Sequence, residues 1–326
     1  GHGSGGRMMH RLIQDLIAPA FKLETLSDSA LFQPDSAWRL ALTTDSFVVS
    51  PLFFPGGDIG KLAVCGTVND LSMVGARPLY LTAGFILEEG LLLNDLRRIV
   101  SSMSETAEKA GVRIMTGDTK VVEHGKCDGI FINTAGVGAI PHELDLSPRK
   151  ICPGDRVIAS GPLGTHGMAI MAERNSLSFD PAIESDTAPL NGLVEVMLDA
   201  ASGIHMMRDP TRGGLATALK EIADQASCRI TLYEHSLPIL PGVRGACELL
   251  GLDPLYVANE GVLVAVVDQR DAAGLLRIMK GHPLAREAAI IGEVGTEADG
   301  MVLLETMAGG TRVLDMLMGE QLPRIC

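Results

Sequence analysis

Three aspartates interrupt apolar segments in the first half of the chain, where an ionised carboxylate is costly unless something compensates its charge. They are Asp45 in TTDSF, Asp70 in VNDL and Asp118 in TGDTK. A shared cation would compensate all three, and Mg²⁺ is typically held by a few carboxylates together with the phosphates of a nucleotide. The alternative is that each acid lies at the exposed end of a strand or helix. The three together favour a metal and nucleotide site.

The last residue, Cys326, places a free thiol at the end of the segment QLPRIC. A terminus is usually the least ordered part of a domain, so this sulfur is easy to reach and to oxidise. Six extended residues span about 20 Å, enough to enter a cleft or to reach a partner. We therefore expect a swinging arm that carries a reactive cysteine. The alternative is a terminal cysteine without a role.

Glycine-rich stretches give a second indication of phosphate binding. HGSGG at 2–6, PGGDIGK at 55–61 and TRGGLATALKE at 211–221 would each let backbone N–H groups approach phosphate oxygens. The last stretch opens a predicted helix, with Thr211 as its expected cap. Neither the P-loop pattern GxxxxGK[ST] nor GxGxxG after a strand occurs. An ordinary turn is the alternative for each stretch taken alone.

The elements that must position these residues alternate between strand and helix. Segments 39–50, 113–123 and 129–140 are typical of strands, and 61–76 of a mostly buried helix. A second helix is expected from a cap at Asn94 to a stop at Gly111. A further helix is expected early in the chain. The second half predicts strands at 156–164, 261–268 and within 300–316, and a helix around 215–226. The turn ICPGD at 151–155 favours a boundary, giving an α/β chain with domains 1–150 and 151–316 and a mobile tail, 317–326.

Composition limits the classes of protein to which the chain can belong. It has 326 residues with 46% hydrophobic content, enough for two cores. A net charge of -13 and a pI near 5.0 oppose nucleic-acid binding. No apolar run is long enough to span a bilayer, and the polar start lacks the apolar stretch of a signal peptide, so we expect a cytoplasmic protein that does not enter a membrane. The six cysteines include no CxxC pair, so neither a disulfide framework nor a zinc site is expected.

The motifs together resemble those of a known family over essentially the whole chain. The hydrogenase maturation factors of the HypE family have similar motifs to HGSGG, TTDSFVVSPLFFPGGDIGKLAVCGTVNDL, GFILEEG, TGDTKVV, INTAGVGAIP, DPTRGGLATALKE, NEG and the terminal LPRIC. That resemblance implies a two-domain PurM-like α/β fold, shared with aminoimidazole ribonucleotide synthetase, selenophosphate synthetase and thiamine-monophosphate kinase. It further implies a homodimer whose first-domain sheets join into a barrel, an α/β sandwich-like second domain, and ATP with Mg²⁺ in the cleft beside the barrel.

The resemblance also implies a reaction at Cys326. Members of this family are ATP-dependent carbamoyl dehydratases that act on their own C-terminal cysteine, after the carbamoyltransferase HypF has made it a thiocarboxamide. Phosphorylation of the amide oxygen lets that oxygen leave as phosphate, while a base removes the N–H protons and a thiocyanate forms. The cyanide then passes to iron held by HypC–HypD, as a ligand for the [NiFe]-hydrogenase centre.

The resemblance also implies a role for each residue that lies in a matching motif. The resemblance assigns metal and nucleotide binding to Asp45, Asp70 and Asp118, and catalysis to Cys326, to Glu260 as a base near the thiocarboxamide nitrogen, and to Lys120, for which a solvated strand-end lysine is the alternative. The remaining nucleotide-side residues are His2, Gly5, Lys61, Thr119, Asp209 and Arg212. His166 in LGTHG is expected to be structural.

Two other functions compete with this interpretation. Selenophosphate synthetases place their reactive residue in the N-terminal glycine-rich loop, where this chain has Ser4 and no thiol. A non-enzymatic thiol carrier that binds nucleotide without turnover is the second alternative. Consumption of ATP by the carbamoylated chain separates the enzyme from the carrier.

Overall fold

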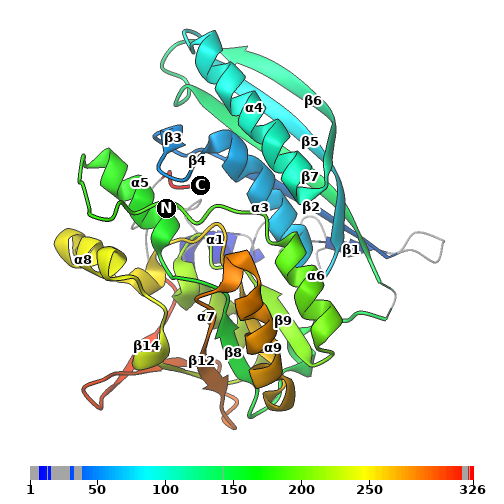
Figure 1. The fold of residues 1–326 in the computed structure, drawn as a ribbon, viewed down its shortest axis with the longest axis vertical. Coiled ribbons are helices and arrows are strands. Elements are labelled where there is room, and N and C mark those ends of the chain that lie inside the picture. Colours follow the sequence, from blue (N-terminus) through cyan, green and yellow to red (C-terminus); the bar gives the residue numbers. More distant parts are fainter. Residues whose placement is uncertain are drawn as a thin grey trace.

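The computed structural model describes residues 7–12, 14–15, 30–32, 39–141, 143–317, 322 and 324–326. It is a mixed α/β structure built on two large sheets (Figure 1). In the described part of the chain, no helix is long and apolar enough to cross a membrane. All six cysteines are free thiols in this structure.

The first sheet has five strands. Their order across the sheet is β1 (Ala30–Phe32), β2 (Arg39–Phe47), β7 (Ile130–Ile140), β5 (Arg77–Glu88) and β6 (Arg113–Val122). Only β5 and β6 run parallel; the other pairs are antiparallel. Alternation of buried and exposed residues along β2 and β7 sets one face of this sheet against the core. The strands predicted at 39–50, 113–123 and 129–140 are confirmed.

Two helices cover one face of the first sheet (Figure 1). Helix α3 (Ile59–Met73) begins at Asp58, whose carboxylate accepts from the N–H groups of Gly60 and Lys61. It is buried nearly all round because it also packs against the second half of the chain. Helix α4 (Leu93–Ala110) ends at Gly111 in the left-handed conformation, as predicted. The prediction of an Asn94 cap was wrong: the helix begins after Leu92, without a side-chain cap.

The second sheet has seven strands and helices on both faces. Its order is β14 (Thr311–Leu314), β13 (Val302–Glu305), β10 (Ile230–Tyr233), β12 (Ala289–Val294), β8 (Arg156–Ala159), β11 (Val264–Val267) and β9 (Ile204–Arg208). Helix α7 (Gly214–Ala226) packs on one face, and α6 (Asn191–Ala200) and α9 (Gln269–Gly281) pack on the other. The predicted helix near 215–226 and the final strand pair are confirmed, whereas the strand expected at 261–268 is limited to β11.

The remaining elements are short or connect the two sheets. Helices α5 (Thr165–Arg174) and α8 (Pro241–Leu250) extend the core of the first half, and α1 (Arg7–Leu12) lies beside residue 317 through a backbone hydrogen bond. The others are β3 (Phe53–Phe54), β4 (Gly57–Asp58), and the 3-10 turns η2 (Pro148–Lys150), η3 (Glu234–Ser236), η4 (Pro254–Tyr256) and η5 (Pro283–Ala285).

Candidate active site

A polar cavity of about 240 Å³ lies between the two halves of the chain, and the C-terminal residue reaches it. The first half contributes residues of β2 and α3, and the second half contributes the loop before α7 and the turn before β11. Five of the predicted site residues and the terminal cysteine meet there: Asp45, Asp70, Asp209, Arg212, Glu260 and Cys326. The fold therefore brings together residues that lie up to about 280 positions apart in the sequence.

Asp45 and Asp70 lie on neighbouring elements of the first half. Asp45 is on the core-facing side of β2, where its Oδ1 accepts from the Ser46 N–H at 2.8 Å. Asp70 is in the last turns of α3, and its Oδ2 accepts from the Thr43 hydroxyl at 2.7 Å. Burial raises the pKa of Asp45, and the positive charge of Arg212 opposes that rise. Both carboxylates thus face one partly enclosed space.

Arg212 is a cation that lines the same cavity as these acids and interacts with their charges. If ionised, Cys326 contributes most to raising the pKa of the Arg212 guanidinium, against burial, and the charges of Asp45 and Glu260 contribute further. The expectation that Thr211 caps α7 was wrong, because the helix begins at Gly214, after Gly213 at φ +82°. The left-handed Gly213–Gly214 pair lets the chain pass close to its neighbours: a Cβ on Gly214 would lie 2.6 Å from the Leu255 carbonyl oxygen.

Glu260 is 2% exposed and lies against the terminal thiol. Burial raises the pKa of Glu260 well above the ordinary value, and the charges of Asp209 and Asp45 add to the rise. Its Oε1 has no hydrogen-bond partner among the described residues. A buried carboxylate oxygen without a donor is unfavourable, so this atom is suited to accept a proton or a hydrogen bond from a group brought into the cavity.

Sequence reasoning missed the residue that holds Glu260 in place. Asp186 Oδ2 accepts from the N–H groups of Glu260 at 3.2 Å and Gly261 at 3.0 Å, and from Asn259 Nδ2 at 2.9 Å. A Cβ on Gly261 would lie 1.8 Å from the Asp186 carbonyl oxygen, so only glycine fits this approach. Asp186 lies in the polar segment ESDTAP, which does not interrupt an apolar run, so nothing in the sequence marked it.

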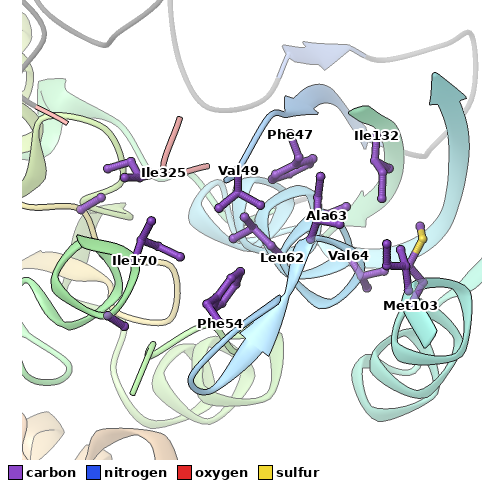
Figure 2. Close-up of a cluster of buried hydrophobic side chains, with 14 of the residues drawn as sticks. Phe47, Val49, Phe54, Leu62, Ala63, Val64, Met103, Ile132, Ile170 and Ile325 are labelled. Carbon is purple, nitrogen blue, oxygen red and sulfur yellow. The ribbon is translucent and has the colours of Figure 1, made fainter. Parts of the chain in front are cut away.

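The tail reaches the cavity along the end of β2. The N–H of Ser50 donates to the Arg324 carbonyl at 3.1 Å, and the N–H of Val48 donates to a carboxylate oxygen of Cys326 at 3.3 Å. Ile325, 3% exposed, joins the apolar cluster of Val49 and Ile170 (Figure 2). These contacts turn the sulfur inward.

The environment of the Cys326 thiol keeps it protonated while it is inside. Burial raises its pKa; Arg212 opposes the rise, and the charge of Glu260 and a hydrogen bond with its side chain add to it. The thiol is half-buried, and in its protonated form it is a poor nucleophile. The inward position therefore suits a sulfur that already carries its group. Attachment of that group needs a reactive thiolate, which forms more easily when the tail lies outside the cavity.

The structure places three of the predicted site residues elsewhere. Asp118, Thr119 and Lys120 lie on β6, three strands from β2, which is about 14 Å at the usual strand spacing. The strand registers put Asp118 on the opposite face of the sheet from Asp45. Lys120 Nζ contacts Asp118 Oδ2 at 2.7 Å, and both side chains are 71% exposed. That contact is the main reason why the pKa of Asp118 is lowered.

The three aspartates therefore do not form one cation site within a single chain. In the parts of the chain that the structure describes, no group of three or more His, Cys, Asp or Glu side chains is placed to hold a metal ion. Lys61, at the start of α3, donates to the Gly56 carbonyl at 2.7 Å and does not line the cavity. His2 and Gly5 lie outside the described residues.

Fold and site together define a class. The chain matches the AIR synthase related protein N-terminal domain over residues 26–140 and the corresponding C-terminal domain over residues 152–304. It has the PurM-like two-domain α/β architecture.

Within that class, the sequence is 55% identical over 329 residues to the carbamoyl dehydratase HypE of Cupriavidus necator, covering 100% of this chain and 94% of that protein. The structure is similar to HypE in a HypE–HypF complex, with a TM-score of 0.88 and 49% identity over 94% of this chain and 99% of that one. It is also similar to HypE in complex with ATP, with a TM-score of 0.85 and 49% identity over 100% and 98% of the two chains. The chain belongs to the carbamoyl dehydratase HypE family, as its motifs predicted.

Proposed function

We propose that this chain is an ATP-dependent carbamoyl dehydratase that converts its own S-carbamoylated Cys326 to a thiocyanate. The observation that carries the proposal is the placement of the terminal thiol beside the side chain of Glu260, whose Oε1 has no partner among the described residues. A carbamoyl group on that sulfur ends in an NH₂ group, which supplies the donors that this buried oxygen lacks. The names of the relatives and the ATP-bound structure support the same activity.

The proposed reaction begins with transfer of the γ-phosphoryl group of ATP to the carbamoyl oxygen. The O–P bond forms as the bond from phosphorus to ADP breaks, and the C–O bond then breaks to release phosphate. The nitrogen loses two protons as the C≡N bond forms, one to a base and one that leaves with the phosphate, so the products are R–S–C≡N, ADP, hydrogen phosphate and one proton. Glu260 is placed to accept a proton from nitrogen, and burial makes it a stronger base than an exposed glutamate. Arg212 offsets negative charge that develops on the carbamoyl oxygen.

Mg²⁺ and ATP fit the acidic side of the cavity in part. Asp45 and Asp70 present carboxylate oxygens to the same space, and two carboxylates with phosphate oxygens are a usual ligand set for Mg²⁺. When bound, the ion would offset phosphate charge. The cavity, at about 240 Å³, is smaller than the ~300–1,000 Å³ typical of ligand pockets. It would therefore admit the phosphate end of the nucleotide rather than the whole molecule. Asp209 lines the same cavity from the second half of the chain.

We further propose that two chains pair through the uncovered face of the first sheet, forming the barrel expected of the family. In the described part of the chain, Leu42, Tyr80 and Ile86 expose 43–47% of their surface on this face. Strand β6 is an exposed edge, and such edges are usually paired or covered. A pairing of this kind would give Asp118 and Lys120 a partner surface, including a route to the second chain's nucleotide. Sedimentation at micromolar concentration should give a dimer, and Tyr80→Glu should give a monomer.

Partners and organisation complete the proposal. The HypE–HypF complex supports HypF as the carbamoyl donor, and HypC–HypD as cyanide acceptor stays a prediction, as does a cytoplasmic location. The first family match ends at residue 140 and the second begins at residue 152, which supports a boundary between units 1–150 and 151–316. A separate tail at 317–326 stays a prediction.

Turnover of the tail tests the function. The chain is carbamoylated with HypF, supplied with Mg-ATP, and the C-terminal peptide is weighed. We expect the peptide to lose one water, with one ADP formed per thiocyanate. Cys326→Ala should form no adduct, and Cys152→Ala, which removes an exposed thiol elsewhere, should behave as the unmodified chain. ATP binding with no change in tail mass would refute the dehydratase and favour the carrier.

A further inference from the structure

His166 contacts the tail from within the protein core. It lies in the first turn of α5 and is fully buried. Its Nε2 is 2.5 Å from the carbonyl oxygen of Ile325, the residue directly before the terminal cysteine. The Phe54 ring meets the imidazole edge-on, with the two ring centroids 5.5 Å apart. A histidine expected to be structural is therefore bonded to the segment that carries the reacting sulfur.

The hydrogen bonds around His166 define its tautomer. The Ile325 carbonyl only accepts, so Nε2 carries the proton and donates it. Nδ1 then accepts from the Ser185 hydroxyl at 2.8 Å. Ser185 Oγ is 2.6 Å from the Thr187 hydroxyl and accepts from the Thr187 N–H at 3.1 Å. The chain of donors therefore points from Thr187 through Ser185 and His166 to the tail. Burial lowers the pKa of His166, which is consistent with a neutral ring.

This donor has a specific effect on the position of the tail. If Ile325 leaves, His166 Nε2–H loses its acceptor while the ring remains enclosed by Phe54 and Ser185, and an unpaired buried donor is unfavourable. The bond is one residue from the sulfur, so it restricts where Cys326 lies relative to Glu260. The tail backbone also accepts hydrogen bonds from the N–H groups of Val48 and Ser50 and from Arg174, which donates to the Arg324 carbonyl.

We propose that His166 is a positioning residue: its Nε2–H holds the Ile325 carbonyl so that the group on Cys326 is presented to Glu260 and Arg212. The reaction part of this proposal rests on the proposed function; the holding of the tail does not. His166 is not among the residues that line the cavity. Removing it should change where the tail lies and leave the nucleotide ligands in place.

Thiol accessibility tests the holding contact without any turnover. Cys326 is alkylated with N-ethylmaleimide in the absence of nucleotide, and the C-terminal peptide is weighed over time. We expect His166→Ala to speed alkylation about tenfold, the scale of one lost buried hydrogen bond. His166→Gln, whose amide can donate from a similar position, should restore most of the protection. His205→Ala is the matched control, since it removes a histidine bonded at 2.7 Å to Asp155 in the second half of the chain.

The dehydration step tests the positioning. After carbamoylation, single-turnover thiocyanate formation should be slower in His166→Ala, with the affinity for Mg-ATP unchanged and His166→Gln intermediate. Alkylation at the unmodified rate in a folded His166→Ala chain would overturn the proposal. If that variant does not fold, Ser185→Ala replaces it: faster alkylation than the unmodified chain would support the contact, and an unchanged rate would overturn it. If Cys326 of the unmodified chain is protected from alkylation but forms no thiocyanate, the proposed function is refuted and the holding contact of His166 is not.

Discussion

Shortening Ile325 should release the tail in steps that follow the apolar surface lost. The side chain is 3% exposed and packs in the cluster of Val49 and Ile170 (Figure 2). Ile325→Val removes one carbon and Ile325→Ala removes three, at about 0.8 kcal/mol for each buried CH₂. The inward position should weaken by about 0.8 and about 2.4 kcal/mol, which reduces its equilibrium constant about fourfold and about 50-fold.

Two measurements separate this equilibrium from the chemistry. Alkylation of Cys326 reports the small outward fraction, so its rate should rise by the full factor in each variant. The dehydration rate depends on the fraction of chains whose tail is inward. That fraction stays near one until the equilibrium constant for the inward position approaches one, so the dehydration rate should fall by a smaller factor than the alkylation rate rises. Leu249→Ala, which shortens an exposed side chain on α8, is the control and should change neither rate. Equal alkylation rates in the unmodified, Val and Ala chains would refute the view that burial of Ile325 holds the tail.

Three further outcomes are expected. Asp70→Asn should weaken Mg-ATP binding in calorimetry by about tenfold or more while keeping the fold, because a charged ligand is lost and the shape is not; unchanged affinity would contradict the assignment. Glu260→Gln should slow dehydration at least about 100-fold. Burial raises the pKa of Glu260, so ionisation of Glu260 destabilises the folded state once the pH rises above the ordinary carboxyl range. The Glu260→Gln variant lacks this cost. Its melting temperature should equal that of the unmodified chain below about pH 5 and should exceed it increasingly above that pH. Adding residues after Cys326 should abolish thiocyanate formation, as judged by peptide mass, and full yield would show that the terminal position is incidental.

The sequence predicted the elements well where the pattern is local. Buried apolar runs and β-branched residues identified α3 and the long strands of the first sheet, and Gly111 marked the end of α4. It also indicated that Asp45 and Asp70 share a site, since each carries a charge into a buried segment. The face of Asp118 was not predictable, because it depends on the register of a parallel pair, and a shift of one residue would reverse it.

Contacts between distant segments explain why the sequence did not reveal the roles of Asp186 and His166. Asp186 acts through hydrogen bonds to a turn more than 70 residues away, and His166 through a bond to Ile325 across 159 positions. Neither has a local signature: a histidine in an apolar setting is compatible with a packed core or with a functional contact. Only the folded chain distinguishes these cases, because the distinction lies in what the ring nitrogens meet.

The energetics of the tail fit a segment that must both enter the cavity and leave it. Arg324 adopts φ +56°, which costs a non-glycine residue about 1–2 kcal/mol. Its contact with Asp128 at 2.8 Å is largely exposed and contributes about 0–1 kcal/mol, so the two effects nearly cancel. What holds the tail is then the burial of Ile325, the His166 bond and a few backbone hydrogen bonds. These contacts amount to a few kcal/mol against the entropy of ordering the segment. A tail bound much more tightly would not present Cys326 to a carbamoyl donor, and one bound much more weakly would not hold the carbamoyl group against Glu260.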